Sequence, residues 1–223
     1  MAYAHQIIDL IADREGRVLD VGCGMGGLAA MLQARNFAVE ALTPNAGQKR
    51  HVDTQYPAIP CHWTKFEDFH SDHRFGTIIN SESLQYIDLA GAFRGVDRLL
   101  APGGRWIVAD YFRRAPSRKR RSGHVYDDFA AKVEADGWKV IVHRDITDHV
   151  LPTLKVLTMY ADRFLRPLED FAFEKLRRRR AWLYYLTRDL RGALQVKLQK
   201  ELGSVHPETF AREKRYLLMA LTR

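Results

Sequence analysis

Residues 18–27 have the sequence VLDVGCGMGG, in which an apolar run and one acidic residue lead into four glycines. The apolar run is typical of a buried strand. The glycines predict a tight turn, because glycine tolerates a positive φ and lets a ligand approach the backbone closely. The next residues, LAAML at 28–32, predict a helix whose first N–H groups favour an anionic or carboxylate-bearing ligand. The segment therefore predicts a strand, a turn and a helix arranged around a ligand.

The same glycines raise the alternative of a dinucleotide site, since Gly22, Gly24 and Gly27 satisfy the pattern G-x-G-x-x-G. Asp20 argues against that alternative. A carboxylate at the end of the strand would repel a pyrophosphate, whereas it could face an ammonium group bound over the turn. A second motif, LLAPGGRWIV at residues 99–108, predicts a helix end, a Pro-Gly-Gly turn and another buried strand.

Together, the two motifs resemble those of the class I S-adenosylmethionine (SAM) methyltransferases. The resemblance covers residues 18–110 and continues more loosely through the strands beyond. It implies an α/β fold, namely a doubly wound, Rossmann-like sheet of seven mostly parallel strands, with the last strand antiparallel between the fifth and the sixth. It also implies SAM as the cofactor and S-adenosylhomocysteine (SAH) as the product.

The order of apolar segments and turn residues agrees with alternating strands and helices. Strands are expected at residues 17–21, 37–43, 59–63, 75–80, 105–111, 138–145 and 214–222, and helices at 4–12, 48–55, 90–100 and 126–136. Such alternation predicts a mainly parallel sheet with helices on both faces.

The last two expected strands are separated by residues 146–213, far more than an ordinary connection. Residues 154–165 and 183–197 keep apolar side chains at helical spacing, so two helices are expected there. We interpret residues 1–148 as the SAM-binding core, 149–208 as a helical cap inserted over the substrate mouth, and 209–223 as the last strand of the core sheet.

Composition limits the class of protein. The chain has 223 residues, of which 46% are hydrophobic, enough for one domain with an appended subdomain. No apolar run approaches the roughly 20 residues of a membrane span, and the first residues lack the form of a signal peptide. The two cysteines, Cys23 and Cys61, cannot make a disulfide framework or a metal cluster and fit a reducing cytoplasm. We therefore expect a cytoplasmic protein without a metal site or a membrane span.

Positive charge is concentrated in the last third of the chain. Residues 1–150 contain 19 basic and 19 acidic side chains, whereas residues 151–223 contain 16 and 8, which accounts for the net charge of +8. Such a surface could meet an anion, an acidic headgroup, nucleic acid or only water. Four consecutive arginines at residues 177–180 are usually a solvated surface, with ligand contact as the alternative.

The resemblance assigns the first group of cofactor contacts to the glycine turn. Asp20, Gly22, Cys23, Gly24 and Gly26 match the family's first motif, where the backbone lies under the methionine part of SAM.

A second group of contacts follows the second strand. The segment LTPNAGQ at residues 42–48 resembles the T-L-S-P-x-Q segment of cyclopropane fatty acid synthases and of sterol or tocopherol C-methyltransferases. Thr43 and Gln48 would then bind the ribose through neutral hydrogen bonds, where the family more often has an acidic residue. Glu40, earlier in the same strand, is the alternative ribose ligand.

Two further pairs are placed by the resemblance. Phe66 and Glu67 fall where the family contacts adenine, although Phe66 could instead be a core residue. Asn80 and Ser81, after the fourth strand, would face the methionine end of SAM.

The catalytic candidates lie nearby. Residues 80–87, NSESLQYI, resemble the S-x-E-S-x-E-H-x segment of small-molecule C- and O-methyltransferases, in which Glu82 would border the reacting methyl group. Tyr86 replaces the family's histidine and could orient a substrate oxygen or only pack. His124 is the first candidate base, because it follows the fifth strand on the ligand side and imidazole titrates near neutral pH. A capping or exposed histidine is the alternative.

These assignments lead to one preferred function and two alternatives. We expect methyl transfer from SAM to an oxygen, carbon or nitrogen of a small apolar or aromatic metabolite, by a chain that could form a homodimer. An RNA methyltransferase that uses the basic C-terminal region is the second hypothesis. A SAM-binding partner without activity is the third.

Overall fold

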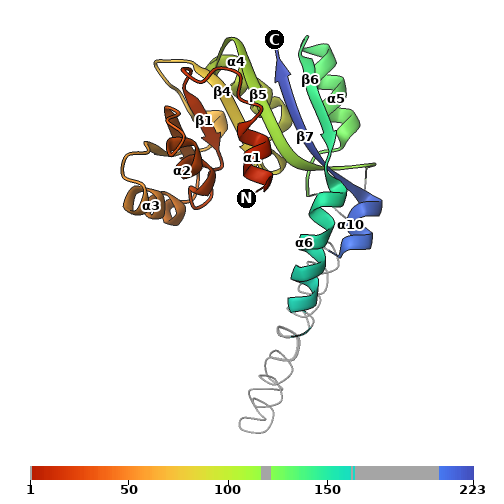
Figure 1. The fold of residues 1–223 in the computed structure, drawn as a ribbon. Coiled ribbons are helices and arrows are strands. Elements are labelled where there is room, and N and C mark those ends of the chain that lie inside the picture. Colours follow the sequence, from red (N-terminus) through yellow and green to blue (C-terminus); the bar gives the residue numbers. More distant parts are fainter. Residues whose placement is uncertain (1, 117–121, 162, 164–205) are drawn as a thin grey trace, which may run out of the picture. The chain divides into compact units, whose positions relative to one another are not determined.

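A computed structural model describes residues 2–116, 122–161, 163 and 206–223 (Figure 1). The chain divides into two compact units, Met1–Ile146 with Arg215–Arg223, and Thr147–Lys214. The sheet and the candidate site belong to the first unit.

The first unit is built on a seven-stranded sheet in the order β3-β2-β1-β4-β5-β7-β6. Its strands are β1 (Val18–Val21), β2 (Val39–Thr43), β3 (Cys61–Trp63), β4 (Phe75–Ser81), β5 (Leu100–Arg113), β6 (Lys139–Asp145) and β7 (Lys214–Thr222). The pairs β2–β3, β1–β2, β1–β4 and β4–β5 are parallel, whereas β7 is antiparallel to β6. The expected Rossmann-like sheet, with its last strand between the fifth and the sixth, is confirmed.

Helices connect these strands as the alternating pattern predicts. They are α1 (Ala2–Ile8), α2 (Gly27–Gln33), α3 (Ala46–Gln55), α4 (Leu89–Leu99) and α5 (Tyr126–Ala135), with single 3-10 turns η1 (Phe66–Asp68) and η2 (Leu84–Tyr86). Asn45 caps α3, because its side-chain oxygen accepts from the backbone N–H groups of Gly47 and Gln48.

The Pro-Gly-Gly segment differs from its prediction. It was expected as a turn before the fifth strand, but β5 already begins at Leu100, and the segment is an irregularity within it. The pairing with β4 shifts from Phe75–Leu100 to Thr77–Arg105, so the extra residues bulge out of the ladder. Gly103 has a φ of 70°, which glycine adopts without strain.

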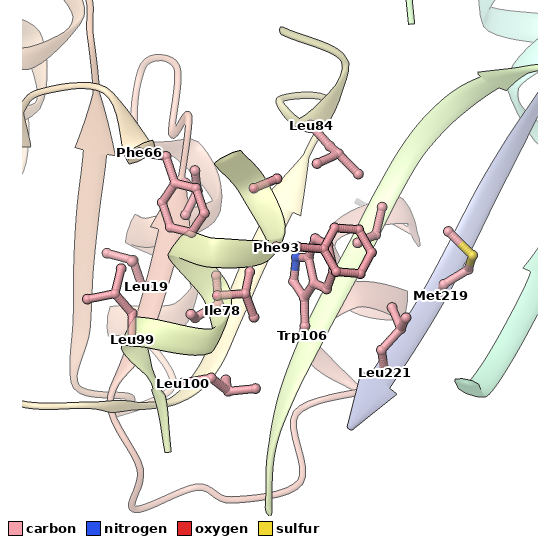
Figure 2. Close-up of a cluster of buried hydrophobic side chains, with 14 of the residues drawn as sticks. Leu19, Phe66, Ile78, Leu84, Phe93, Leu99, Leu100, Trp106, Met219 and Leu221 are labelled. Carbon is pink, nitrogen blue, oxygen red and sulfur yellow. The ribbon is translucent and has the colours of Figure 1, made fainter. Parts of the chain in front are cut away.

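Both faces of the sheet are buried at β5, whereas the edge strand β6 is largely exposed. Trp106 and Val108 of β5 belong to a cluster that also contains Phe93 of α4 and Phe129 of α5. The alternate residues Ile107 and Ala109 are equally inaccessible on the other face. Figure 2 shows Phe93 beside Trp106, whose ring centroids lie 5.0 Å apart in an edge-to-face arrangement.

The second unit contributes two described helices, α6 (Thr147–Tyr160) and α10 (Pro207–Glu213). α6 begins earlier than the helix expected at residues 154–165. The second expected helix, at residues 183–197, and the arginine run at 177–180 lie outside the described residues. That the insertion caps the substrate mouth stays a prediction. Within the described ranges, no helix combines the length and the apolar character needed to cross a membrane.

Candidate functional site

The glycine turn after β1 has the backbone geometry that its sequence predicts. Gly22, Gly24 and Gly26 all have positive φ, at 73°, 56° and 82°. A side chain at Gly22 would overlap the Cβ of Ser83. The N–H groups of Gly22 and Cys23 both donate to the carbonyl of Leu42, at 2.8 and 3.1 Å. The turn is therefore fixed against β2 and leaves bare backbone on its open side.

A cavity of about 550 Å³ opens beside this turn. Its wall comes from the carboxyl ends of β1, β2 and β4 and from the segments that follow them, which is where open α/β sheets bind ligands. The lining residues are Val21, Gly22, Cys23, Gly24, Leu42, Thr43, Pro44, Gln48, Lys65, Phe66, Glu67, Ser81, Glu82, Ser83, Tyr86 and Ile87.

The cavity brings together most of the residues that the sequence singles out. Those on its wall are Gly22, Cys23, Gly24, Thr43, Gln48, Phe66, Glu67, Ser81, Glu82 and Tyr86. Four others, Asp20, Gly26, Asn80 and His124, are not among the lining residues. These four lie behind the wall or beside it.

Asp20 lies beneath the glycine turn. It is only 2% exposed, and burial raises its pKa to about 7, although the backbone N–H of Ala29 partly offsets this shift. Within the described residues its Oδ2 atom has no hydrogen-bond partner. A buried carboxylate oxygen without a partner is costly, and a cationic group bound at the turn would compensate it. The residue thus fits the predicted role while lying deeper than the sequence suggested.

Thr43 and Gln48 form a polar pair on the cavity wall. The Thr43 hydroxyl donates to Gln48 Oε1 at 2.6 Å and accepts the backbone N–H of Asn45 at 3.2 Å. Because the amide oxygen of Gln48 is occupied, its NH₂ group remains to donate to a ligand oxygen. This arrangement suits neutral recognition of hydroxyl groups.

Glu40, the alternative ribose ligand, lies away from the cavity. Its carboxylate is 8% exposed and contacts His62 Nε2 and His73 Nε2, both at 2.8 Å, with Arg17 at 3.5 Å. These three partners occupy Glu40. The geometry favours Thr43 and Gln48 over Glu40 for contact with a ligand.

Phe66 has the position that each of the two interpretations requires, and its contact with adenine stays a prediction. It is a member of the hydrophobic core and also lines the cavity. A methyl group at Gly95 would lie 2.6 Å from Phe66 Cε1, so a glycine in α4 makes room for the ring. Lys65, which the sequence analysis missed, adds a cation to the wall beside Glu67. The sequence signal for including Lys65 was its position directly before Phe66, which had been assigned to the site.

Asn80 supports the wall from behind. It is fully buried, donates through Nδ2 to Ser83 Oγ at 2.9 Å, and accepts from Trp106 Nε1 at 2.9 Å. Ser83 in turn packs against Gly22. Of the predicted pair Asn80 and Ser81, only Ser81 lies on the cavity wall.

His124 contacts backbone rather than the cavity. Its Nε2 lies 2.9 Å from the Leu84 carbonyl and 3.0 Å from the Ile87 carbonyl. Two carbonyl partners require a protonated nitrogen, so this atom has no lone pair to accept a substrate proton. The contacts of Nε2 match the capping alternative, and the role of His124 as the base stays a prediction. Tyr86 is 80% exposed at the cavity rim.

Glu82 has an unusual backbone conformation. Its φ is 55°, in the left-handed region that residues other than glycine seldom occupy. Its N–H donates to the Ala109 carbonyl at 2.9 Å, and its Oε1 accepts the Tyr216 hydroxyl at 2.8 Å. Such strain persists only where the surroundings hold it, and it gathers at functional sites. The sequence pattern around Tyr216 had not marked it as a site residue.

Asp110 fixes the neighbouring 3-10 turn. It is 1% exposed, and burial raises its pKa to about 7. Its carboxylate accepts the backbone N–H groups of Gln85 at 3.1 Å and Tyr111 at 2.8 Å. It therefore holds the segment that carries Tyr86 at the rim.

Comparisons of sequence place this chain among methyltransferases. A family model described as a methyltransferase domain matches residues 2–179. Phosphoethanolamine N-methyltransferase 3 of Arabidopsis thaliana is 28% identical over 175 residues, which are 67% of this chain and 34% of that protein. A ubiquinone biosynthesis O-methyltransferase of Bradyrhizobium sp. (strain ORS 278) is 29% identical over 98 residues, 42% of this chain and 39% of that one. The chain thus spans little more than a third of these relatives' lengths.

Solved structures agree on the fold. Geranyl diphosphate C-methyltransferase from Streptomyces coelicolor A3(2), in complex with Mg²⁺, geranyl diphosphate and SAH, superposes with a TM-score of 0.69 at 18% identity, covering 100% of this chain and 78% of that one. A cyclopropane synthase from Mycobacterium tuberculosis gives 0.72 at 13% identity, covering 100% and 83%. The fold is that of the class I methyltransferases. Since the family model matches well over half of its residues, the chain belongs to the methyltransferase domain family.

Proposed function

We propose that this protein transfers a methyl group from SAM to a small metabolite. The observation that carries the proposal is the cavity of about 550 Å³ at the carboxyl ends of β1, β2 and β4, with bare glycine backbone on one wall and a carboxylate on another. A cavity of this size is typical of small-molecule sites.

The wall offers matching partners for each part of SAM. The turn at Gly22 and Gly24 would lie under the methionine part, with the unpaired oxygen of Asp20 beneath it for the ammonium group. Gln48, oriented by Thr43, would donate to the ribose. The ring of Phe66, with Lys65 and Glu67 beside it, would contact the adenine. These residues fit a zwitterionic nucleoside better than a pyrophosphate.

The protein has little covalent chemistry to perform. SAM supplies a methyl group already activated on a sulfonium. The chain has to orient the acceptor toward that group and exclude water. Glu82 is the ionisable side chain at the strand ends that both lines the cavity and is held by a neighbouring side chain. It is therefore the group that we assign to the acceptor side.

The class of acceptor is a small metabolite with an oxygen, carbon or nitrogen nucleophile. By their names, the relatives and neighbours reported above are a phosphoethanolamine N-methyltransferase, an O-methyltransferase of ubiquinone biosynthesis and a geranyl diphosphate C-methyltransferase. We also propose the cytoplasm as the location, because Cys23 and Cys61 are both free thiols, which suits a reducing compartment.

Calorimetric titration followed by a transfer assay tests the function. SAH and NAD are titrated separately, and labelled methyl transfer from SAM is then measured with ethanolamine-type amines, phenols, prenyl diphosphates and total RNA. We expect SAH to bind, NAD not to bind, and label to enter a small-molecule acceptor. NAD binding without SAH binding would refute the proposal. Label in RNA alone, or binding without transfer to any pool, would replace it with one of the other two hypotheses.

A further inference from the structure

A chain of hydroxyl groups lies behind Glu82, and among its members only Ser81 also lines the cavity. Tyr3 of α1 has its hydroxyl 2.9 Å from Ser81 Oγ and 2.9 Å from the Tyr216 hydroxyl of β7. Tyr216 in turn lies 2.8 Å from Glu82 Oε1. The two tyrosine rings meet edge to face, with centroids 6.1 Å apart. Segments from the two ends of the chain thus converge on the residue at the rim of the cavity.

The direction of each hydrogen bond follows from the number of protons. A carboxylate only accepts, so Tyr216 donates its single proton to Glu82. The Tyr216 oxygen then accepts from Tyr3, and the Tyr3 oxygen accepts from Ser81. Along these shorter contacts all three hydroxyl protons point toward Glu82, and the Ala109 carbonyl is a longer, competing acceptor for both tyrosines. Burial raises the pKa of Tyr3 to about 12 and raises that of Tyr216 as well, so both tyrosines stay protonated donors.

The backbone restrains the same residue. Glu82 keeps its left-handed φ through the bond from its N–H to the Ala109 carbonyl. Tyr216 and Tyr3 also lie within 3.3 and 3.4 Å of that carbonyl. Asn36, the other described residue besides glycine with positive φ, follows α2, and its side chain tolerates this conformation. Glu82 has no such intrinsic preference, so its conformation depends on the contacts around it.

One oxygen of Glu82 remains available. Oε1 accepts from Tyr216, whereas Oε2 has no hydrogen-bond partner among the residues that the structure describes. Glu82 itself lines the cavity. A carboxylate held on one oxygen and open on the other is suited to a cationic hydrogen-bond donor, which a protonated amine provides.

We propose that Tyr216, oriented by Tyr3, is a positioning residue that holds Glu82 to receive a proton from a primary or secondary amine acceptor. The inference rests on the proposed function and specifies its substrate class. The N–H bond of the ammonium breaks, its electron pair stays on nitrogen, and the proton forms an O–H bond with Glu82 Oε2. The neutral amine then has the lone pair that methyl transfer requires.

Sinefungin and SAH provide a test that does not need the acceptor. Sinefungin carries an amine where SAM carries its methyl group, and SAH carries nothing there. Both are titrated calorimetrically into the wild type and into Glu82→Gln, Tyr216→Phe, Tyr3→Phe and the double variant Glu82→Gln/Tyr216→Phe. Tyr126→Phe is the matched control, since its hydroxyl contacts His143 at 3.1 Å and does not line the cavity.

We expect sinefungin to bind the wild type more tightly than SAH does. Glu82→Gln should weaken sinefungin at least about 10-fold, as expected for loss of a charge-assisted hydrogen bond, and Tyr216→Phe about 3- to 10-fold. Tyr3→Phe should follow with a smaller loss. SAH affinity should stay within about twofold in every variant. The double variant should lose no more sinefungin affinity than Glu82→Gln alone.

The outcomes separate the two proposals. If the wild type does not bind SAH, the proposed function fails. The inference fails if SAH binds but Tyr216→Phe weakens SAH and sinefungin equally. It also fails if the loss of sinefungin affinity in Tyr216→Phe adds to that in Glu82→Gln. In either case the tyrosines only anchor α1. In the transfer assay, the inference is supported if label enters amines and if Tyr216→Phe lowers kcat for them about 10-fold at unchanged KM. Labelling of phenols but not of amines overturns it.

Discussion

The two sides of the cavity are built in different ways. The β1 side is a local structure, in which three glycines with positive φ, within five residues of one another in the chain, present backbone to the ligand. The β4 side depends on distant partners, since Tyr3 and Tyr216 reach Ser81 and Glu82 from α1 and β7. The comparison teaches that the proposed cofactor side can be specified by a short motif, whereas the proposed acceptor side requires the whole unit to fold.

Gly22→Ala should break the local side most severely. The new methyl group meets both a φ of 73° and the Cβ of Ser83. We expect SAH affinity to fall at least about 100-fold, because two sources of strain act on the turn that we propose as its binding site. Gly103→Ala is the matched control, since its φ is 70° and nothing lies within 4 Å. It should cost about 1 kcal/mol of unfolding free energy in urea and leave SAH binding intact. An equal loss of SAH affinity in Gly22→Ala and Gly103→Ala would contradict the assignment of SAH binding to the turn.

Trp106→Phe probes the buried support shared by both sides. Loss of the indole N–H leaves the oxygen of Asn80 without its partner and opens a void, so unfolding in urea should become easier by about 3 kcal/mol. Trp138→Phe removes a ring of the same size whose Nε1 has no partner in the described part of the chain. Its loss should be nearer 1 kcal/mol. Equal losses of unfolding free energy in the two variants would show that the hydrogen bond to Asn80 does not contribute to stability.

Asp20 and Asp110 form a matched pair of buried carboxyls, one on each side, both with pKa raised to about 7. Raised values mean that the folded protein binds protons that the unfolded chain releases near pH 4. Each group therefore lowers stability as pH rises from about 4 to 7, by about 1.4 kcal/mol for each pH unit in which only the folded state is protonated.

Ligand binding should affect the protonation of these two carboxyl groups differently. An ammonium bound at the turn favours ionised Asp20, so SAH binding at pH 7 should release about half a proton. Calorimetry in buffers of different ionisation enthalpy measures this release. We expect Asp20→Asn to abolish it and Asp110→Asn to retain it. Release that survives in Asp20→Asn would place the ammonium elsewhere.

Thr43→Val should give the smallest effect and refines the ribose assignment. The isosteric change removes the donor to Gln48 Oε1, so SAH affinity should fall about 3- to 10-fold, as for one neutral hydrogen bond. Glu40→Gln should leave SAH affinity unchanged and lower the thermal midpoint instead, because its partners are His62 and His73. The reverse pattern would make Glu40 the ribose ligand.

What the sequence predicts follows the same division. Short motifs and the family resemblance they carry predict the strand order, the glycine turn, and the pair Thr43 and Gln48. The turn and this pair lie on the cavity wall. Tyr216 could not be found, because the apolar pattern of β7 predicts a strand but not which distant carboxylate its hydroxyl meets. The depth of Asp20 and the backbone contacts of His124 likewise depend on packing between segments far apart in the chain.

The position of β7 has a consequence for synthesis on the ribosome. β7 follows β6 in the chain but is inserted between β5 and β6, so β6 cannot join the sheet until β7 has emerged. The nascent chain has the complete β1 turn long before that moment. Such non-local closure is slow and leaves strand edges exposed meanwhile. A nascent chain therefore has the glycine turn complete before Tyr216, which holds Glu82, has been synthesised.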